Sequence, residues 1–200
     1  MSANKGVVED FIVFTEKEHH LRKTFFAIGM ACTMAAASMA HAAGNAAPFG
    51  VELGVATMEQ VKAMLGPNAK REDSGQNQYT KGPMFDVEGA SLNVEGVKLA
   101  RFVFDQAKVL AGVIVIMDKD PKGLYKTLSA KYKPVSNKID KFMNYGTAHL
   151  EKGDSVILIE APHLDFTMEV DYITKSLMAS WKQTTAEQAA SKQKRKAEAL

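Results

Sequence analysis

The clearest pattern in the chain is a strict alternation of apolar and polar positions in two segments. Phe102 and Phe104 alternate with Arg101, and residues 166–172 alternate in the same way, with Phe166 among the apolar positions. A period of two predicts β-strands with one buried face. The segment 109–117 is apolar on both alternating sides, which is typical of a central strand covered on both faces, or covered on one face with an apolar concavity on the other.

Start signals and apolar faces predict three helices. A capping box at Thr57–Gln60 begins the first, and Gly66 supplies its left-handed end. Asp120, followed by proline, is the N-cap of the second. From Thr174 a third helix carries Leu177 on its buried side and then gives way to a polar Ala/Gln/Lys tail.

The order of these elements indicates the fold class. Further strands are predicted around 78–81, 90–95, 139–145, 148–151 and 156–160, with a polar loop at 68–76. Few helices and mostly consecutive strands predict an α+β fold with an antiparallel sheet of about seven or eight strands and helices on one face. The halves 49–118 and 119–173 are each predicted as a helix followed by a meander.

Residues 21–42 have the layout of a secretory signal peptide. A basic pair precedes an uncharged, mostly apolar run over 24–40, and small residues follow it. We expect cleavage between Ala42 and Ala43, and therefore export to the periplasm. The apolar run is at the lower limit for spanning a bilayer, so a stable membrane anchor is the poorer interpretation.

The segment 1–20 does not belong to this layout, because Glu16 and Glu18 put negative charge where a basic region is expected. We interpret 1–20 as an upstream extension, with translation starting at Leu21. Cys32 is the only cysteine, and it lacks the aliphatic residue three positions earlier that a lipobox needs, so lipidation is the minority interpretation. Cleavage would then leave a cysteine-free chain.

The mature chain is predicted to contain one domain, 43–173, followed by a C-terminal helix and basic tail, 174–200. The sequence has 25 Lys and Arg against 23 Asp and Glu, a net charge of +2. This balance argues against nucleic acid as a partner. The basic residues at 192–196 are interpreted as a solvated helix end; a weak contact with anionic lipid or cell-wall polymer is the alternative.

Two short patterns resemble catalytic motifs. Gly153-Asp154-Ser155 matches the start of the nucleophile block of GDSL-type hydrolases, but His163 and Asp165 stand in reversed order for that family, and Gly-Asp is ordinary turn chemistry. Asp86 and Glu88 share a face if they lie on a strand, which is the spacing an acid–base pair needs. We interpret the first as a turn and the second as two solvated acids.

The mature chain keeps only His149 and His163. With Glu151, Glu160 and Asp165 they have the donor types of a zinc site, and Met143 and Met168 add those of a copper(I) site. No spacing fixes such a geometry, so no metal, no cofactor and no catalytic residue is predicted, and Met168 is assigned to the core.

The segment Gly54–Pro67 resembles the opening motif of the SmpA/OmlA type of small envelope-assembly lipoproteins. The chain departs from that family in lacking a lipobox and in placing Pro67 directly after Gly66. Paired helix-plus-sheet units of this kind also resemble β-lactamase-inhibitory-protein-like modules. The resemblance implies a periplasmic protein-contact role and no active site.

Two functions remain open on the sequence. The leading hypothesis is a non-enzymatic periplasmic module that binds an envelope protein or another envelope component through one sheet face. The alternative is a small-ligand carrier or hydrolase whose site assembles from Tyr145, His149, His163 and Asp165. A pocket with converging polar groups would favour the alternative, and an exposed apolar patch would favour the hypothesis.

Overall fold

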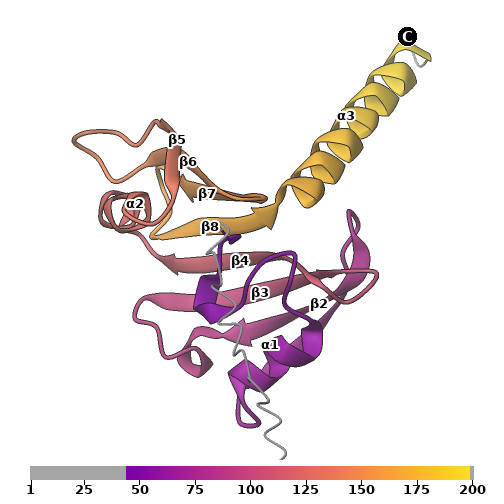
Figure 1. The fold of residues 1–200 in the computed structure, drawn as a ribbon. Helices are drawn as coiled ribbons and strands as arrows, with labels where there is room; N and C mark the ends of the chain where they lie inside the picture. Colours follow the sequence, from indigo (N-terminus) through magenta and orange to yellow (C-terminus); the bar gives the residue numbers. More distant parts are fainter. Residues whose placement is uncertain (1–43, 199–200) are drawn as a thin grey trace, which may run out of the picture. The chain divides into compact units, whose positions relative to one another are not determined.

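The computed structural model describes residues 44–198. The extension 1–20, the signal peptide 21–42 and the cleavage site at Ala42 and Ala43 therefore lie outside the described residues. The described part contains one antiparallel sheet of eight strands with three α-helices, so the predicted α+β class is confirmed (Figure 1). The strands are β1 (Arg71–Gln76), β2 (Lys81–Glu88), β3 (Val97–Asp105), β4 (Leu110–Asp118), β5 (Lys133–Asn137), β6 (Gly146–Lys152), β7 (Ser155–Ala161) and β8 (Thr167–Thr174).

The helices divide the strands into two similar sets. The α-helices are α1 (Met58–Leu65), α2 (Pro121–Ser129) and α3 (Lys175–Glu198), and two short 3-10 turns are η1 (Pro48–Gly50) and η2 (Gly89–Ser91). The strand order is β1-β2-β3-β4-β8-β7-β6-β5, so each set is one helix followed by a four-strand meander. The two meanders join through β4 and β8, where Val115 pairs with Val170.

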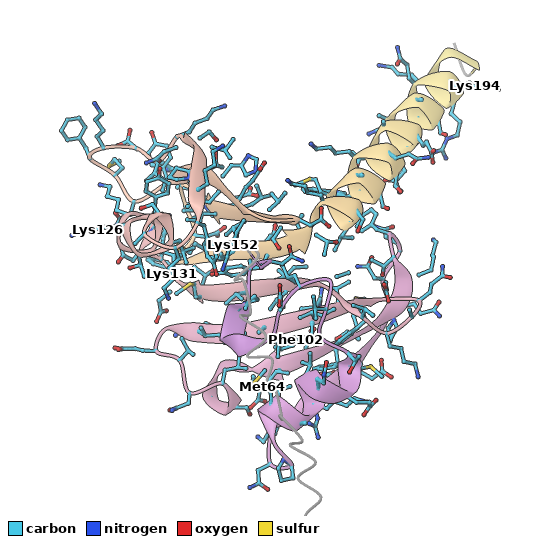
Figure 2. All side chains as sticks on the ribbon, in the orientation of Figure 1. Met64, Phe102, Lys126, Lys131, Lys152 and Lys194 are labelled. Atoms are coloured by element: carbon cyan, nitrogen blue, oxygen red, sulfur yellow. The ribbon has the colours of Figure 1, made fainter. Side chains whose placement is uncertain are left out.

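One face of the sheet, here called the covered face, carries the main core. Phe102 is fully buried there with Phe85 stacked on it at 5.4 Å between ring centroids, on the side where α1 lies (Figure 2). Val61 of α1 and Leu128 of α2 pack into the same cluster. Burying a side chain of this size contributes about 1.5–3 kcal/mol, so this face accounts for most of the hydrophobic stabilisation.

The helix α3 begins against the opposite face, here called the open face. Leu177 packs there with Val103, Val156 and Ile173. The predicted arrangement of helices on one face therefore holds for α1 and α2 but not for α3. The reason is local: β8 continues into α3 with no loop, and the Thr174 hydroxyl accepts a hydrogen bond from the Leu177 amide at 3.2 Å.

Several strand predictions were wrong. The segment 71–76, predicted as a loop, is the edge strand β1, and 133–137 forms the other edge, β5. Neither shows an apolar alternation because nearly every position on both is exposed. The segments predicted as strands around 78–81, 90–95 and 139–145 are mostly turns and loops, and β2 begins only at Lys81.

The helix α3 also differs from its prediction: it was expected to end after Trp181, but it continues to Glu198. Alanine, glutamine and lysine have high helix propensity, so this part can stay helical without an apolar face. None of the helices in the described residues is long and apolar enough to cross a bilayer.

Candidate functional site: a pocket on the open face

The carboxylates at 86 and 88 share the open face, as their spacing predicts, but they do not form an acid–base pair. Asp86 accepts two hydrogen bonds from the Arg101 guanidinium, both at 2.7 Å. The bound guanidinium lowers the pKa of Asp86, so this carboxyl stays ionised and is a poor proton donor. Glu88 lies 3.6 Å from the ammonium of Lys70.

The Gly153-Asp154-Ser155 tripeptide forms the turn between β6 and β7, as predicted. Gly153 has a φ of 56°, a conformation that glycine adopts readily. Ser155 is fully buried, and its hydroxyl accepts a hydrogen bond from the Ala46 amide at 3.0 Å. This serine fixes the start of the domain to β7 and is not presented to any substrate.

The scattered residues of the alternative site are only partly brought together. The Tyr145 and His163 rings are in edge contact, with centroids 4.8 Å apart. His149 lies on β6, where its Nε2 is 3.4 Å from an oxygen of Glu151 without a hydrogen bond. Across residues 44–198, no hydrogen bond, ion pair or ring contact joins His149 to that ring pair.

The residues considered as metal ligands from the sequence are not brought together either. In the described part of the chain, no group of three or more His, Cys, Asp or Glu side chains is arranged to hold a metal ion. Met168 is buried in the core, as predicted, whereas Met143 is 53% exposed on a loop.

The strongest candidate site is a cavity of about 280 Å³ on the open face, beside the start of α3. We call it the α3 pocket. Its apolar floor comes from β3, β4 and β8, and its apolar wall comes from the first two turns of α3. Its lining residues are Val103, Ile114, Ile173, Leu177, Trp181, Asn77, Tyr79, Glu160, Glu169 and Asp171.

Three carboxylates line this pocket because of the register of two strands. Glu160 on β7 pairs directly with Glu169 on β8, and Leu158 pairs with Asp171. Residues two apart on a strand share a face, so all three acids project from the open face. Like charges directly opposite each other destabilise a sheet, so a pair of glutamates is unusual between two central strands.

The innermost acid, Asp171, is poorly satisfied. Its Oδ1 is buried and has no hydrogen-bond partner among the described residues. Burial raises the pKa of Asp171 to about 7, and the nearby Glu169 carboxylate adds to the rise by repulsion and by sharing a proton. Arg101 also interacts with Glu169, but its guanidinium is already bound to Asp86.

Sequence reasoning assigned no binding residue and missed this pocket. The alternation in β8 does place Glu169 and Asp171 opposite the apolar side, where we expected solvent. The signal that could have located it is the neighbouring strand β4, which is apolar on both faces and for which an apolar concavity on one face was one of the two expectations. A strand covered on both sides indicates that the face carrying these acids is itself partly buried.

The pocket combines negative charge with an apolar floor and an indole wall. Carboxylates bind ammonium and guanidinium groups through charge-assisted hydrogen bonds, and the face of an indole attracts cations. The arrangement is therefore suited to a cation carried on an apolar stem. Comparisons of the chain with family models, curated proteins and solved structures gave no match.

Proposed function

We propose that this domain is a non-enzymatic binding module of the periplasm that holds a cationic group of an envelope partner in the α3 pocket. The observation that carries the proposal is the buried Asp171 Oδ1, which has no hydrogen-bond partner among the described residues, beside Glu169 and the apolar floor formed by Ile114. A lysine or arginine side chain supplies both the missing charge and an apolar stem of matching length.

Size favours a partner's side chain over a free metabolite. Pockets that enclose small molecules usually have volumes of roughly 300–1,000 Å³, and the α3 pocket is slightly below that range. It also lies on a broad sheet face, where a partner has surface to contact around an inserted side chain. A carrier for a small organic ammonium compound remains the second candidate, because the same carboxylates would bind it.

A hydrolase is the least supported of the functions considered from the sequence. The pocket contains carboxylates but neither histidine, and Ser155 is buried away from it. Covalent catalysis by serine needs an exposed hydroxyl next to a base. The export to the periplasm and the SmpA/OmlA-type resemblance are part of the same proposal, and both agree with a partner in the envelope.

The first test uses Trp181, the only tryptophan of the chain, which lines the pocket. Its fluorescence is titrated with butylguanidinium and butylammonium ions, and with butanol as the uncharged molecule of the same stem. We expect saturable changes for the two cations, with dissociation constants of about a millimolar, because such small ligands make few contacts. Butanol should give no saturable change.

Two variants make this titration specific. The double variant Glu169→Gln with Asp171→Asn should abolish saturation, whereas Glu88→Gln should not, because Glu88 shares the open face but lies outside the pocket. Equal responses to butanol and to the cations would refute a cation site. Native mass spectrometry of the protein from its host separates the candidates: a bound small amine indicates a carrier.

A further inference from the structure

The three most exposed large apolar residues in the described part of the chain lie on two loops at one end of the sheet. The side chains of Phe142, Leu164 and Phe166 are 92%, 86% and 93% exposed, and that of Met143 is 53% exposed. We call these four residues the tip patch. Phe166 was predicted to face the core with Met168, but β8 begins only at Thr167, so its ring projects into solvent.

Both loops are held by specific hydrogen bonds. Asp140 accepts hydrogen bonds from the amides of Phe142 at 2.8 Å and Met143 at 2.7 Å. The Lys119 amide donates to the Phe166 carbonyl at 3.2 Å, and the Lys119 ammonium donates to the carbonyls of Asp165 and Pro162. The exposed side chains are therefore presented by ordered backbone.

The two loops form one surface because the segment 119–122 and a ring contact connect them. Lys119 binds the β7–β8 loop, while the Lys122 ammonium donates to the Lys141 carbonyl in the β5–β6 loop at 2.9 Å. The Tyr145 and His163 rings also join the loops. Figure 1 shows the β5–β6 loop at the end of the sheet beside α2.

Around the tip patch, basic side chains slightly outnumber acidic ones. Four lysines, at 119, 122, 138 and 141, stand against the aspartates at 120, 140 and 165. Asp120 and Asp140 accept hydrogen bonds from the backbone amides of Gly123 and Phe142. Lysines around exposed aromatic and leucine side chains are the composition of peripheral membrane-binding surfaces.

We propose that the tip patch docks reversibly on the surface of an anionic lipid bilayer. Phe142, Leu164 and Phe166 insert into the boundary between head groups and acyl chains, and the lysines contact anionic head groups. Separate side chains at the tips of convex loops favour a fluid lipid surface, because a protein partner would need a matching pocket for each of them. The α3 pocket, on the open face, plays no part in this docking.

The test is co-sedimentation of the protein isolated from the periplasmic fraction of its host with vesicles of phosphatidylglycerol and of phosphatidylcholine. We expect binding to phosphatidylglycerol vesicles that weakens with added salt, as charge attraction requires. The triple variant Phe142→Ser, Leu164→Ser, Phe166→Ser should lower the partition coefficient at least about tenfold, because most of the inserted apolar area is lost.

A matched control and a second readout keep the outcome unambiguous. Val55→Ser changes an apolar side chain that is 58% exposed and outside the tip patch, and should bind like the wild type. Lys138→Glu with Lys141→Glu should remove the preference for phosphatidylglycerol. Phe166→Trp should show a blue-shifted emission, quenched by brominated lipid, that the wild-type Trp181 lacks.

Either of two results would overturn the proposal. One is equal vesicle binding by the triple variant and the wild type. The other is loss of a protein contact in the triple variant without any change in vesicle binding, which would assign the tip patch to a protein partner. The titration of Trp181 with butylguanidinium should be the same in all these variants except Phe166→Trp, so this docking and the cation site can fail independently.

Discussion

Glu160 on β7 lies directly opposite Glu169 on β8, and Asp171 follows on the same face of the sheet. Glu160 and Glu169 are exposed to solvent, but the more deeply buried Asp171 carboxyl beside them is costly to ionise unless a positive charge is supplied. Arg101 supplies it only in part, since its guanidinium interacts with Glu169 but donates its hydrogen bonds to Asp86. The relationship between Glu160 and Glu169 is therefore a reason to expect a cation from outside the domain.

Binding of a cation in the α3 pocket should strengthen as the pH rises through about 7. Below this pH Asp171 is largely protonated, because burial and the Glu169 carboxylate raise its pKa to about 7. Glu160 from β7 is the other acid that faces it, and no basic group lines the pocket. Trp181 titrations with butylguanidinium at pH values from about 5.5 to 8.5 test this. The pH dependence should disappear in Asp171→Asn, and a flat wild-type profile would contradict the prediction.

The variant Asp171→Asn should be more stable than the wild type at pH 7 and above. At pH values below 3.8, the unfolded value, Asp171 is neutral in both states; between 3.8 and about 7 only the folded state keeps the proton. The stability from this proton is therefore lost progressively between pH 3.8 and about 7 and is absent above that pH. We expect a gain of roughly 2–4 kcal/mol in the free energy of unfolding at neutral pH.

Urea denaturation at pH 4 and pH 8 measures this difference. The two proteins should differ little at pH 4, and Glu88→Gln should show no comparable gain at pH 8. A wild type that matches Asp171→Asn at pH 8 would show that the Asp171 carboxylate is already compensated.

The variant Ser155→Ala should lose about 1–3 kcal/mol of stability. Its hydroxyl is fully buried and is the acceptor for the Ala46 amide at 3.0 Å, so alanine leaves a buried N–H group unpaired. Ser136→Ala, on the exposed strand β5, is the control. Thermal unfolding followed by circular dichroism checks the prediction, and equal midpoints for both variants would show that Ala46 is not fixed by Ser155.

The variant Gly112→Val should loosen the start of α3. A Cβ at this position would lie 3.0 Å from Leu177 Cδ2 and 3.1 Å from Ile173 Cγ2, so a larger side chain must displace Leu177. We expect a loss of about 1–3 kcal/mol from overpacking and a weaker response of Trp181 to butylguanidinium. Ala179→Val, on an exposed position of α3, should change neither by as much.

The protein recovered from the periplasmic fraction of its host should have the mass of Ala43–Leu200. This follows from the proposed cleavage after Ala42 and is checked by intact-mass spectrometry. A cytoplasmic protein that still carries residues 1–42 would refute export and would restore Cys32 as a thiol to be considered. The N-terminal extension 1–20 should be missing in either fraction if translation starts at Leu21.

The sequence predicted those parts of the fold whose signals are local. The capping box at Thr57 and the N-cap Asp120 are in place, and the alternating pattern of β3 and β8 specified their faces. The edge strands β1 and β5 could not be predicted, because a strand held mainly by backbone hydrogen bonds needs no apolar alternation.

The α3 pocket was missed for a different reason. Glu169 and Asp171 were placed on the correct side of β8, but their surroundings depend on which strands lie next to β8. Pairing of β8 with β4 across the middle of the sheet is a long-range event without a local signal. Phe166 illustrates the opposite error, since one more alternating residue was assigned to a strand that starts after it.

The sheet order also bears on how the chain folds during synthesis. The outer strands β1 and β5 come first in their meanders, and the inner strands β4 and β8 come last. The strand β4 can therefore pair with β8 only after the last strand has been synthesised. Until then β4, the strand buried on both faces, has an unpaired edge. Such an edge can pair with other chains, so the first half should aggregate when it is produced without the second. The junction between β4 and β8 thus makes the first meander dependent on completion of the chain.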